Sequence, residues 1–171
     1  MEKKVSECMS KRLITIHKAA TMSSAYERMK KNGIRHLPVI DETKEIIGIL
    51  SDRDVNRAVH STINNTEGWR SEELNFGVDS IVADYMTWPI KSFDKSTPLQ
   101  AVIKKMISEK ISSFLISDAG RMVGIITSDD LLHVLDRIIG EQGEDSKLSL
   151  NDLLLNPLFT DTARLAAGAG I

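Results

Sequence analysis

Two short stretches of the chain share one pattern: G-I-L-S-D-R-D at residues 48–54 and G-I-I-T-S-D-D at residues 124–130. Each contains a glycine, two aliphatic residues, a hydroxyl residue, two polar residues and an aspartate. The aliphatic residues are typical of a buried strand, and a hydroxyl residue three places before an acidic residue is typical of a helix N-terminus. Each stretch therefore predicts a strand that passes directly into a helix.

The sequence around these two stretches repeats as well. Residues 5–41 align with residues 82–118 at an offset of 77 without a gap, and after one dropped residue 48–59 falls on 124–135. Only nine aligned pairs are identical, but the apolar positions and the turns agree nearly throughout. A repeat of this length indicates two copies of one supersecondary unit.

The first copy contains the signals of five elements. A brief strand is expected at residues 13–16, followed by a helix whose apolar residues recur at spacings of three, four and seven. Two apolar strands then flank a polar turn, and the last helix starts at Ser51. The helix face is formed by Met22, Ala25, Tyr26 and Met29, and the two later strands are expected at residues 36–40 and 46–50.

The second copy contains the same signals in the same order. Its first helix is expected to begin with Thr97 as the N-cap and Pro98 at the first helical position. Its last helix is expected to start at Thr127. The strands are expected at residues 90–93, 113–117 and 122–126. The sequence therefore predicts an α/β fold of two β-α-β-β-α units, related by a pseudo-twofold axis.

The repeat also divides the chain into parts. Residues 1–59 form the first unit, residues 60–80 a polar linker, and residues 81–139 the second unit. Residues 140–171 form a C-terminal tail, which we expect to be partly helical because residues 148–159 are rich in leucine. That apolar stretch has two interpretations: a helix that packs on its own chain or on a dimer mate, or a docking peptide for another protein.

Composition argues against several classes of function. The 22 basic and 24 acidic residues give a net charge of -2, whereas nucleic-acid binders are more often basic. No apolar run is long enough to span a bilayer, and the charged N-terminus resembles no secretory signal, so we expect a cytoplasmic protein. The histidines and the single cysteine have no metal-ligand spacing, and no catalytic motif is present. We therefore expect neither an enzyme nor a metal protein.

The repeated segments resemble the CBS (cystathionine β-synthase-type) domain, two copies of which usually pair as a Bateman module. In the first copy the match lies in G-I-R-H-L-P-V-I-D at residues 33–41 and in the motif at 48–54. In the second copy it lies in I-S-S-F-L-I-S-D at residues 111–118 and in the motif at 124–130. The resemblance implies pseudo-twofold pairing of the two domains and a homodimer of two such chains.

The resemblance also implies a ligand. In this family adenosine compounds bind in clefts between the two domains, where the motif aspartate holds the ribose hydroxyls and the Ser or Thr contacts ribose or phosphate. The corresponding residues are Ser51 with Asp54 and Thr127 with Asp130. Independently of the family, a carboxylate can accept hydrogen bonds from two adjacent hydroxyls, although both motifs also fit plain helix caps.

Basic side chains near the first motif suggest where a phosphate would bind. Members that this chain resembles use basic residues against phosphates near the positions of Arg35, His36 and Arg53. The other interpretation is three surface charges. Because the second copy has Asp129 in place of Arg53, a charged nucleotide is expected at the first copy's site, while the second site takes a less charged adenosine compound or stays empty.

These observations give two hypotheses for function. In the first, the chain is a regulatory module that binds AMP, ADP, ATP or a compound of the S-adenosylmethionine class, requires no cofactor, and signals to a protein effector. In the second, it is a ligand-free structural or dimerisation module that serves as a protein-interaction scaffold. Binding of nucleic acid or of a membrane is not expected in either case.

Overall fold

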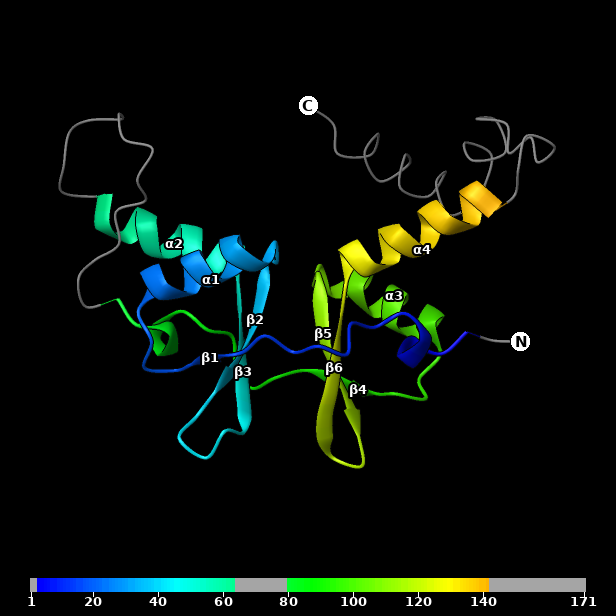
Figure 1. Cartoon of the computed structure of the whole chain (residues 1–171), viewed down its shortest axis with the longest axis horizontal. Coiled ribbons are helices and arrows are strands. Elements are labelled where there is room, and N and C mark those ends of the chain that lie inside the picture. Colours follow the sequence, from blue (N-terminus) through cyan, green and yellow to red (C-terminus); the bar gives the residue numbers. More distant parts are fainter. Residues whose placement is uncertain (1–2, 64–79, 142–171) are drawn as a thin grey trace. The chain divides into compact units, whose positions relative to one another are not determined.

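The computed structural model describes residues 3–63 and 80–141 (Figure 1). Each repeat contains a three-stranded sheet and two helices, and a short 3-10 helix precedes each repeat. In chain order the elements are η1 (Val5–Glu7), β1 (Ile16–His17), α1 (Met22–Asn32), β2 (His36–Ile40), β3 (Ile46–Ser51), α2 (Asp52–Ile63), η2 (Val82–Asp84), β4 (Ser92–Asp94), α3 (Leu99–Glu109), β5 (Ser113–Asp118), β6 (Arg121–Thr127) and α4 (Ser128–Glu141). The α/β fold of two β-α-β-β-α repeats is confirmed.

The two sheets have the same topology. In each, a short first strand pairs in parallel with the second strand, which pairs antiparallel with the third. The parallel pairing of β1 and β2 matches Ile16 with Val39, and the antiparallel pairing of β2 and β3 matches His36 with Ser51. In the second sheet Ser113 is matched with Thr127 in the same way. The start of the second strand therefore lies beside the hydroxyl residue of each motif.

Helix α1 begins and ends where its sequence predicts. The Thr21 hydroxyl accepts a hydrogen bond from the Ser24 backbone N–H at 3.2 Å, which caps the N-terminus. Gly33 ends the helix in the left-handed conformation at φ 61°, which a residue without a side chain adopts at little cost. The buried residues of this helix are Met22, Ala25 and Met29, which confirms most of the expected apolar face.

Several predicted boundaries differ from those of the structure by one to three residues, and three of them are informative. The first strand begins at Ile16 instead of residue 13, and the equivalent β4 begins at Ser92 instead of residue 90, because only the later residues reach the second strand of each sheet. Pro98 occupies the N-cap of α3, which starts at Leu99, so Thr97 is not the cap. The Leu99 backbone N–H donates instead to the Lys3 carbonyl at 2.8 Å, a partner that local sequence cannot reveal.

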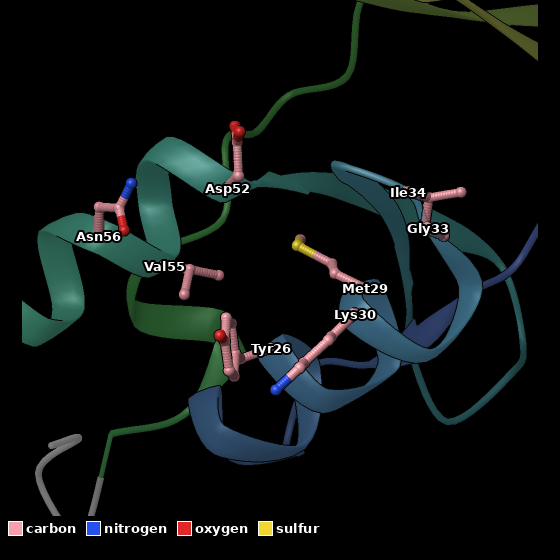
Figure 2. Close-up of a pocket in the computed structure, with 8 residues that line it drawn as sticks. All are labelled: Tyr26, Met29, Lys30, Gly33, Ile34, Asp52, Val55 and Asn56. Carbon is pink, nitrogen blue, oxygen red and sulfur yellow. The ribbon is translucent and has the colours of Figure 1, made fainter. Parts of the chain in front are cut away.

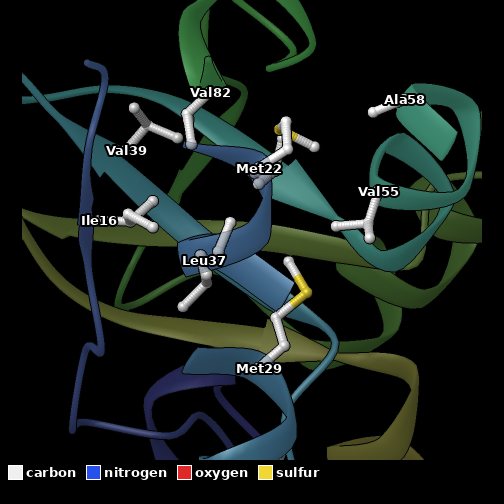
Figure 3. Close-up of a cluster of buried hydrophobic side chains, with 10 residues drawn as sticks. Ile16, Met22, Met29, Leu37, Val39, Val55, Ala58 and Val82 are labelled. Atoms are coloured by element: carbon white, nitrogen blue, oxygen red, sulfur yellow. The ribbon is translucent and has the colours of Figure 1, made fainter. Parts of the chain in front are cut away.

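The segments that precede the two repeats are exchanged between the hydrophobic cores. Val82, from the segment before the second repeat, is fully buried in the core of the first repeat with Ile16, Met22 and Leu37 (Figure 3). Val5, near the N-terminus, is fully buried in the core of the second repeat, where it joins Phe114. Each core is therefore completed by a residue that lies outside its own repeat in the sequence.

Backbone hydrogen bonds hold the exchanged segments in place. The Val82 N–H donates to the Ala20 carbonyl and the Val5 N–H donates to the Thr97 carbonyl, both at 2.9 Å. Further along the chain, an isolated antiparallel bridge joins Thr87 to Ile49 of β3, with one backbone hydrogen bond in each direction. Equivalent bonds join Ser10 to Ile125 of β6, at 2.8 and 3.0 Å. Both segments thereby end directly beside a motif strand.

A methionine in each exchanged segment packs on the glycine of a motif. A Cβ atom added to Gly48 would lie 2.7 Å from the Met86 sulfur, and one added to Gly124 would lie 2.5 Å from the Met9 sulfur. Both distances are well below van der Waals contact, so a side chain at either glycine would displace the methionine. Met86 and Met9 also pack against the hydrophobic cores of the first and the second repeat, respectively.

The chain divides into one compact unit of Met1–Leu131 and a second of Leu132–Ile171. Of the second unit the structure describes only the part of α4 that ends at Glu141, so the apolar stretch at 148–159 lies outside the described residues. Within that part of α4, Leu132, Leu135 and Ile139 are all more than half exposed. Among the described helices there is none long and apolar enough to cross a membrane.

Candidate ligand site

The first motif closes a reciprocal cap at the start of α2. The Ser51 backbone N–H and the Ser51 hydroxyl both donate to the Asp54 carboxylate oxygen Oδ2, at 2.8 and 2.7 Å. The Asp54 backbone N–H donates back to the Ser51 hydroxyl at 3.4 Å. The second carboxylate oxygen, Oδ1, lies 3.0 Å from Nη2 of Arg57, and Asp54 as a whole is only 7% exposed.

The second motif repeats this cap at the start of α4. The Thr127 backbone N–H and hydroxyl donate to Oδ2 of Asp130, both at 2.7 Å, and the Asp130 N–H donates back at 3.3 Å. The second carboxylate oxygen, Oδ1, accepts a hydrogen bond from the Ser10 hydroxyl at 3.0 Å. Ser10 belongs to the exchanged N-terminal segment, so this bond joins two distant parts of the sequence.

The two oxygens of each aspartate therefore have different roles. In both motifs Oδ2 serves the helix cap, which confirms the capping interpretation of the sequence. Oδ1 is held by a peripheral group, the Ser10 hydroxyl in one motif and Arg57 in the other, whose side chain is 62% exposed. An incoming hydroxyl can replace such a partner without loss of the cap, so capping and ligand binding by one aspartate are compatible.

The Arg35 side chain contacts the second motif. Its guanidinium pairs with Asp129 of the second motif, with Nη2 2.5 Å from Oδ1 and Nε 3.3 Å from Oδ2. This hydrogen-bonded pairing raises the pKa of Arg35. Only the backbone of Arg35 reaches the first motif, where its carbonyl accepts from the Asp52 N–H at 2.9 Å. A contact between residues so far apart in the chain depends on the pairing of the repeats.

His36 is buried between the two repeats. It is 9% exposed, and its Nε2 lies 3.0 Å from the Ser112 hydroxyl, the residue before β5. Burial lowers the pKa of His36 from its ordinary value of 6.5, which keeps the ring neutral at physiological pH. As a neutral ring, His36 provides a hydrogen bond to an adjacent group and no charge for a phosphate.

Arg53, unlike Arg35, is not paired with an acidic residue of the described part of the chain. It is exposed on the first turn of α2 and forms no hydrogen bond or ion pair with any residue in the described ranges. The structure thus pairs Arg35 with Asp129 and His36 with Ser112 of the other repeat, whereas Arg53 has no counterion within residues 3–63 and 80–141.

A pocket of about 280 Å³ lies between α1 and the first turns of α2 and is lined by none of the seven residues that the sequence singled out (Figure 2). Its wall is mostly apolar, and Met29 and Val55 point into it from the two helices. Lys30 and Asp52 supply charge at its edge. Sequence reasoning assigned the apolar face of α1 to the core and could not distinguish a filled space from an open one.

A metal centre finds no support in the described residues. Within residues 3–63 and 80–141 there is no group of three or more His, Cys, Asp and Glu side chains placed to hold a metal ion. At the two helix starts the candidate site has carboxylate oxygens, which can accept hydrogen bonds from hydroxyl groups.

The family model for the CBS domain matches this chain twice, at residues 5–61 and 82–137. These matches coincide with the two repeats and include both motifs. The chain therefore belongs to the CBS domain family, and its described part is a CBS domain pair. Both matches start at the exchanged segments, at Val5 and Val82.

Among relatives, a CBS domain-containing protein of Dictyostelium discoideum is 30% identical over 139 residues, which cover 79% of this chain and 92% of that protein. L-aspartate semialdehyde sulfurtransferase of Methanosarcina acetivorans is 28% identical over 134 residues, or 78% of this chain. The matched region makes up only 24% of that enzyme, and 42% of an uncharacterised Methanocaldococcus jannaschii protein that is 25% identical over 131 residues.

Solved structures show the same fold. The CBS domain pair of protein MJ0100, in complex with 5′-methylthioadenosine and S-adenosyl-L-methionine, has a TM-score of 0.65 and 25% identity. The similarity covers 83% of this chain and 99% of that one. The structure of CBSX2 in complex with AMP has a TM-score of 0.62 at 23% identity and covers 80% of this chain and 98% of that one, a likeness of fold.

Proposed function

We propose that this chain is a regulatory module that binds an adenosine-containing ligand at its two motifs and passes the signal to a protein effector. One observation carries the proposal: in both repeats a motif aspartate uses Oδ2 for the cap and presents Oδ1 to an exchangeable partner. Two adjacent ribose hydroxyls are suited to such an oxygen. The complex of the related MJ0100 pair with two adenosine compounds supports the choice of ligand class.

Thermal unfolding tests the proposal. A ligand that binds only the native state at 100 times its Kd raises the unfolding temperature by roughly 5–10 °C in a domain of this size. We expect such a shift with at least one of adenosine, 5′-methylthioadenosine, S-adenosylmethionine, AMP, ADP and ATP. Guanosine compounds serve as the comparison. The absence of a shift with every adenosine compound would sink the proposal.

Asparagine variants separate ligand binding from capping. Asp54→Asn and Asp130→Asn keep a carbonyl oxygen for the cap but lose the charge and one of the two acceptors. We expect both variants to fold and at least one to lose the thermal shift. Asp118→Asn is the control, because Asp118 is also an ion-paired carboxylate, bonded to Lys95, but lies at the β5–β6 turn and caps no helix. Unchanged binding in both site variants would show that the motifs only cap helices.

We also propose a homodimer, as the resemblance implied. Support comes from α4, where Leu132, Leu135 and Ile139 recur at spacings of three and four and are exposed. Sedimentation equilibrium is expected to give a dimer that dissociates in Leu135→Glu and persists in Arg137→Glu, an exposed polar position on the same helix. A monomeric parent chain would contradict the dimer and leave ligand binding untouched.

A further inference from the structure

The pocket between α1 and α2 is apolar inside and opens to solvent. Met29 and Val55 point into it from the two helices, and both side chains are buried (Figure 2). Lys30 and Asn56 lie at its edge and are exposed. Water inside such a pocket has few polar partners, so an apolar side chain that replaced this water would lower the free energy. The pocket is therefore suited to an aliphatic anchor residue from another surface.

Helix α4 presents side chains of this kind. Leu132 is 62% exposed, and Leu135, three positions further along the same face of the helix, is also more than half exposed. An exposed apolar stripe on a helix is typical of a face that packs against another surface. The proposed homodimer requires a surface on the second copy that receives these leucines.

The repeat alignment indicates which surface that is. It makes Leu132 of α4 equivalent to Asn56 of α2, so the exposed leucine and the edge of the pocket occupy corresponding places in the two repeats. A twofold axis that sets the first repeat of one chain against the second repeat of another brings each pocket to the other chain's α4. The same contact then forms twice, and the assembly closes as a dimer.

Charge favours this contact over one between two copies of α4. Helix α1 contains three basic residues and one acidic residue, whereas α4 contains four acidic residues and one basic residue. The Lys30 ammonium lies 5.9 Å from the centre of the Tyr26 ring and forms no ion pair within the described ranges. Asp136, one turn after Leu132, is exposed and is equally without an ion pair in residues 3–63 and 80–141. Opposite charges across an interface favour association, and like charges oppose it.

We infer that Leu132 of each chain enters the α1–α2 pocket of a second copy, with Leu135 beside it and Asp136 next to Lys30. The first repeat of one chain therefore faces the second repeat of the other. This inference rests on the homodimer proposed above, and it adds which surfaces meet and in which orientation. It is independent of the adenosine ligand.

Cross-linking through introduced cysteines tests the orientation. Lys30→Cys and Asp136→Cys leave the leucines in place, and a disulfide requires Cα atoms about 4.4–6.8 Å apart. The two variants, one of them with an affinity tag, are mixed under reducing conditions and then oxidised. We expect a disulfide that joins tagged to untagged chains. The parent chain, whose single cysteine is Cys8, and a mixture of Asp136→Cys with Glu45→Cys, at the exposed β2–β3 turn, are expected to give none.

Disulfides within one variant would decide against the inference. Cross-links in Asp136→Cys alone would show that α4 meets α4, and cross-links in Lys30→Cys alone would show that α1 meets α1. Either result, or a dimeric parent without the mixed disulfide, would overturn the orientation while the homodimer stands. A monomeric parent in sedimentation equilibrium would overturn the homodimer itself.

The dissociation constant of the dimer gives a second measurement. Leu132→Ser removes a buried leucine from both contacts, and the loss of such a side chain weakens association by about tenfold or more per contact. Trp88→Ser is the control, because Trp88 is 70% exposed but lies in the segment after η2. Lys30→Glu and Asp136→Lys are each expected to weaken the dimer severalfold, and the double variant to recover it. A double variant that does not recover, or equal weakening by Trp88→Ser, would contradict the contact.

Discussion

Met86 lies against Gly48, although the two residues belong to different repeats in the sequence. The methionine sulfur occupies the space that a side chain at position 48 would need, at 2.7 Å from an added Cβ atom. Met9 has the same relation to Gly124. The glycine that opens each motif is thus required by a side chain from a distant segment.

Gly48→Ala is therefore expected to destabilise the chain by about 1–3 kcal/mol, since the added methyl group displaces Met86 from a well-packed position. Gly140→Ala is the matched control. Gly140 lies in α4 with nothing within 4 Å of an added Cβ, and alanine favours a helix, so this change is expected to stabilise by up to about 1 kcal/mol. Urea unfolding measures both. A Gly48→Ala chain as stable as the parent would contradict the close packing.

Asp54→Ala is expected to lower the free energy of unfolding by about 1–3 kcal/mol. It removes the acceptor of the Ser51 N–H and hydroxyl and leaves these groups without their partner at a nearly buried position. Asp52→Ala is the control, because Asp52 lies in the same first turn but accepts none of these bonds. Chemical denaturation of the two variants compares them. Equal losses would attribute the effect to helix-dipole charge instead of the cap.

Val5→Ala is expected to loosen the second repeat, although Val5 precedes the first. Its side chain is fully buried with Leu99, Val102 and Phe114, and its truncation in a core costs about 1–3 kcal/mol. Amide hydrogen exchange is expected to accelerate along β5 and β6 more than along β2 and β3. Ile107→Ala is the control, because Ile107 is 71% exposed. Equal acceleration in both sheets would show that the repeats unfold only as one body.

His36 gives the chain a stability that depends on pH. Burial lowers its pKa in the native state, so between pH 6.5 and that lower pKa the unfolded chain binds a proton that the native chain does not. The free energy of unfolding is therefore expected to fall as the pH drops below 6.5. The native-state pKa values of Asp41, Glu42, Asp94 and Glu109 are also lowered, but their losses begin only near pH 4.5 and below.

His36→Gln is expected to remove the part of this dependence that lies between pH 6.5 and the carboxylate range, while glutamine still offers Ser112 a hydrogen bond. Urea unfolding at a series of pH values measures the slope in both proteins. An identical slope in the variant would assign the dependence to another group.

The repeat and its order of elements are predictable from sequence because apolar spacing and turn residues are local signals. The helix face of Met22, Ala25 and Met29 follows from spacing alone. The reciprocal cap of Ser51 and Asp54 follows in the same way from two residues three positions apart. Such features depend on neighbours in the chain, so a single sequence contains the information for them.

The remaining features depend on contacts between distant residues. The N-terminal boundary of α3 differs from its prediction because Lys3 accepts the Leu99 N–H. The pairing of Arg35 with Asp129 could not be predicted for the same reason: Asp129 is 94 positions away and reaches Arg35 only once the repeats have paired. The pocket beside Met29 could not be predicted either. Apolar spacing shows which side chains face inward, but it does not show how completely they fill the space between the helices.

The exchange of Val5 and Val82 has a consequence for the order of folding during synthesis. The first repeat cannot complete its core until Val82 has left the ribosome, and Val5 has no binding place until the strand at Ile126 has emerged. Contacts of such high sequence separation are slow to form, because a long loop must close before they are made. The segment around Val5 therefore stays without its native core contacts until nearly the whole of the described chain has been translated.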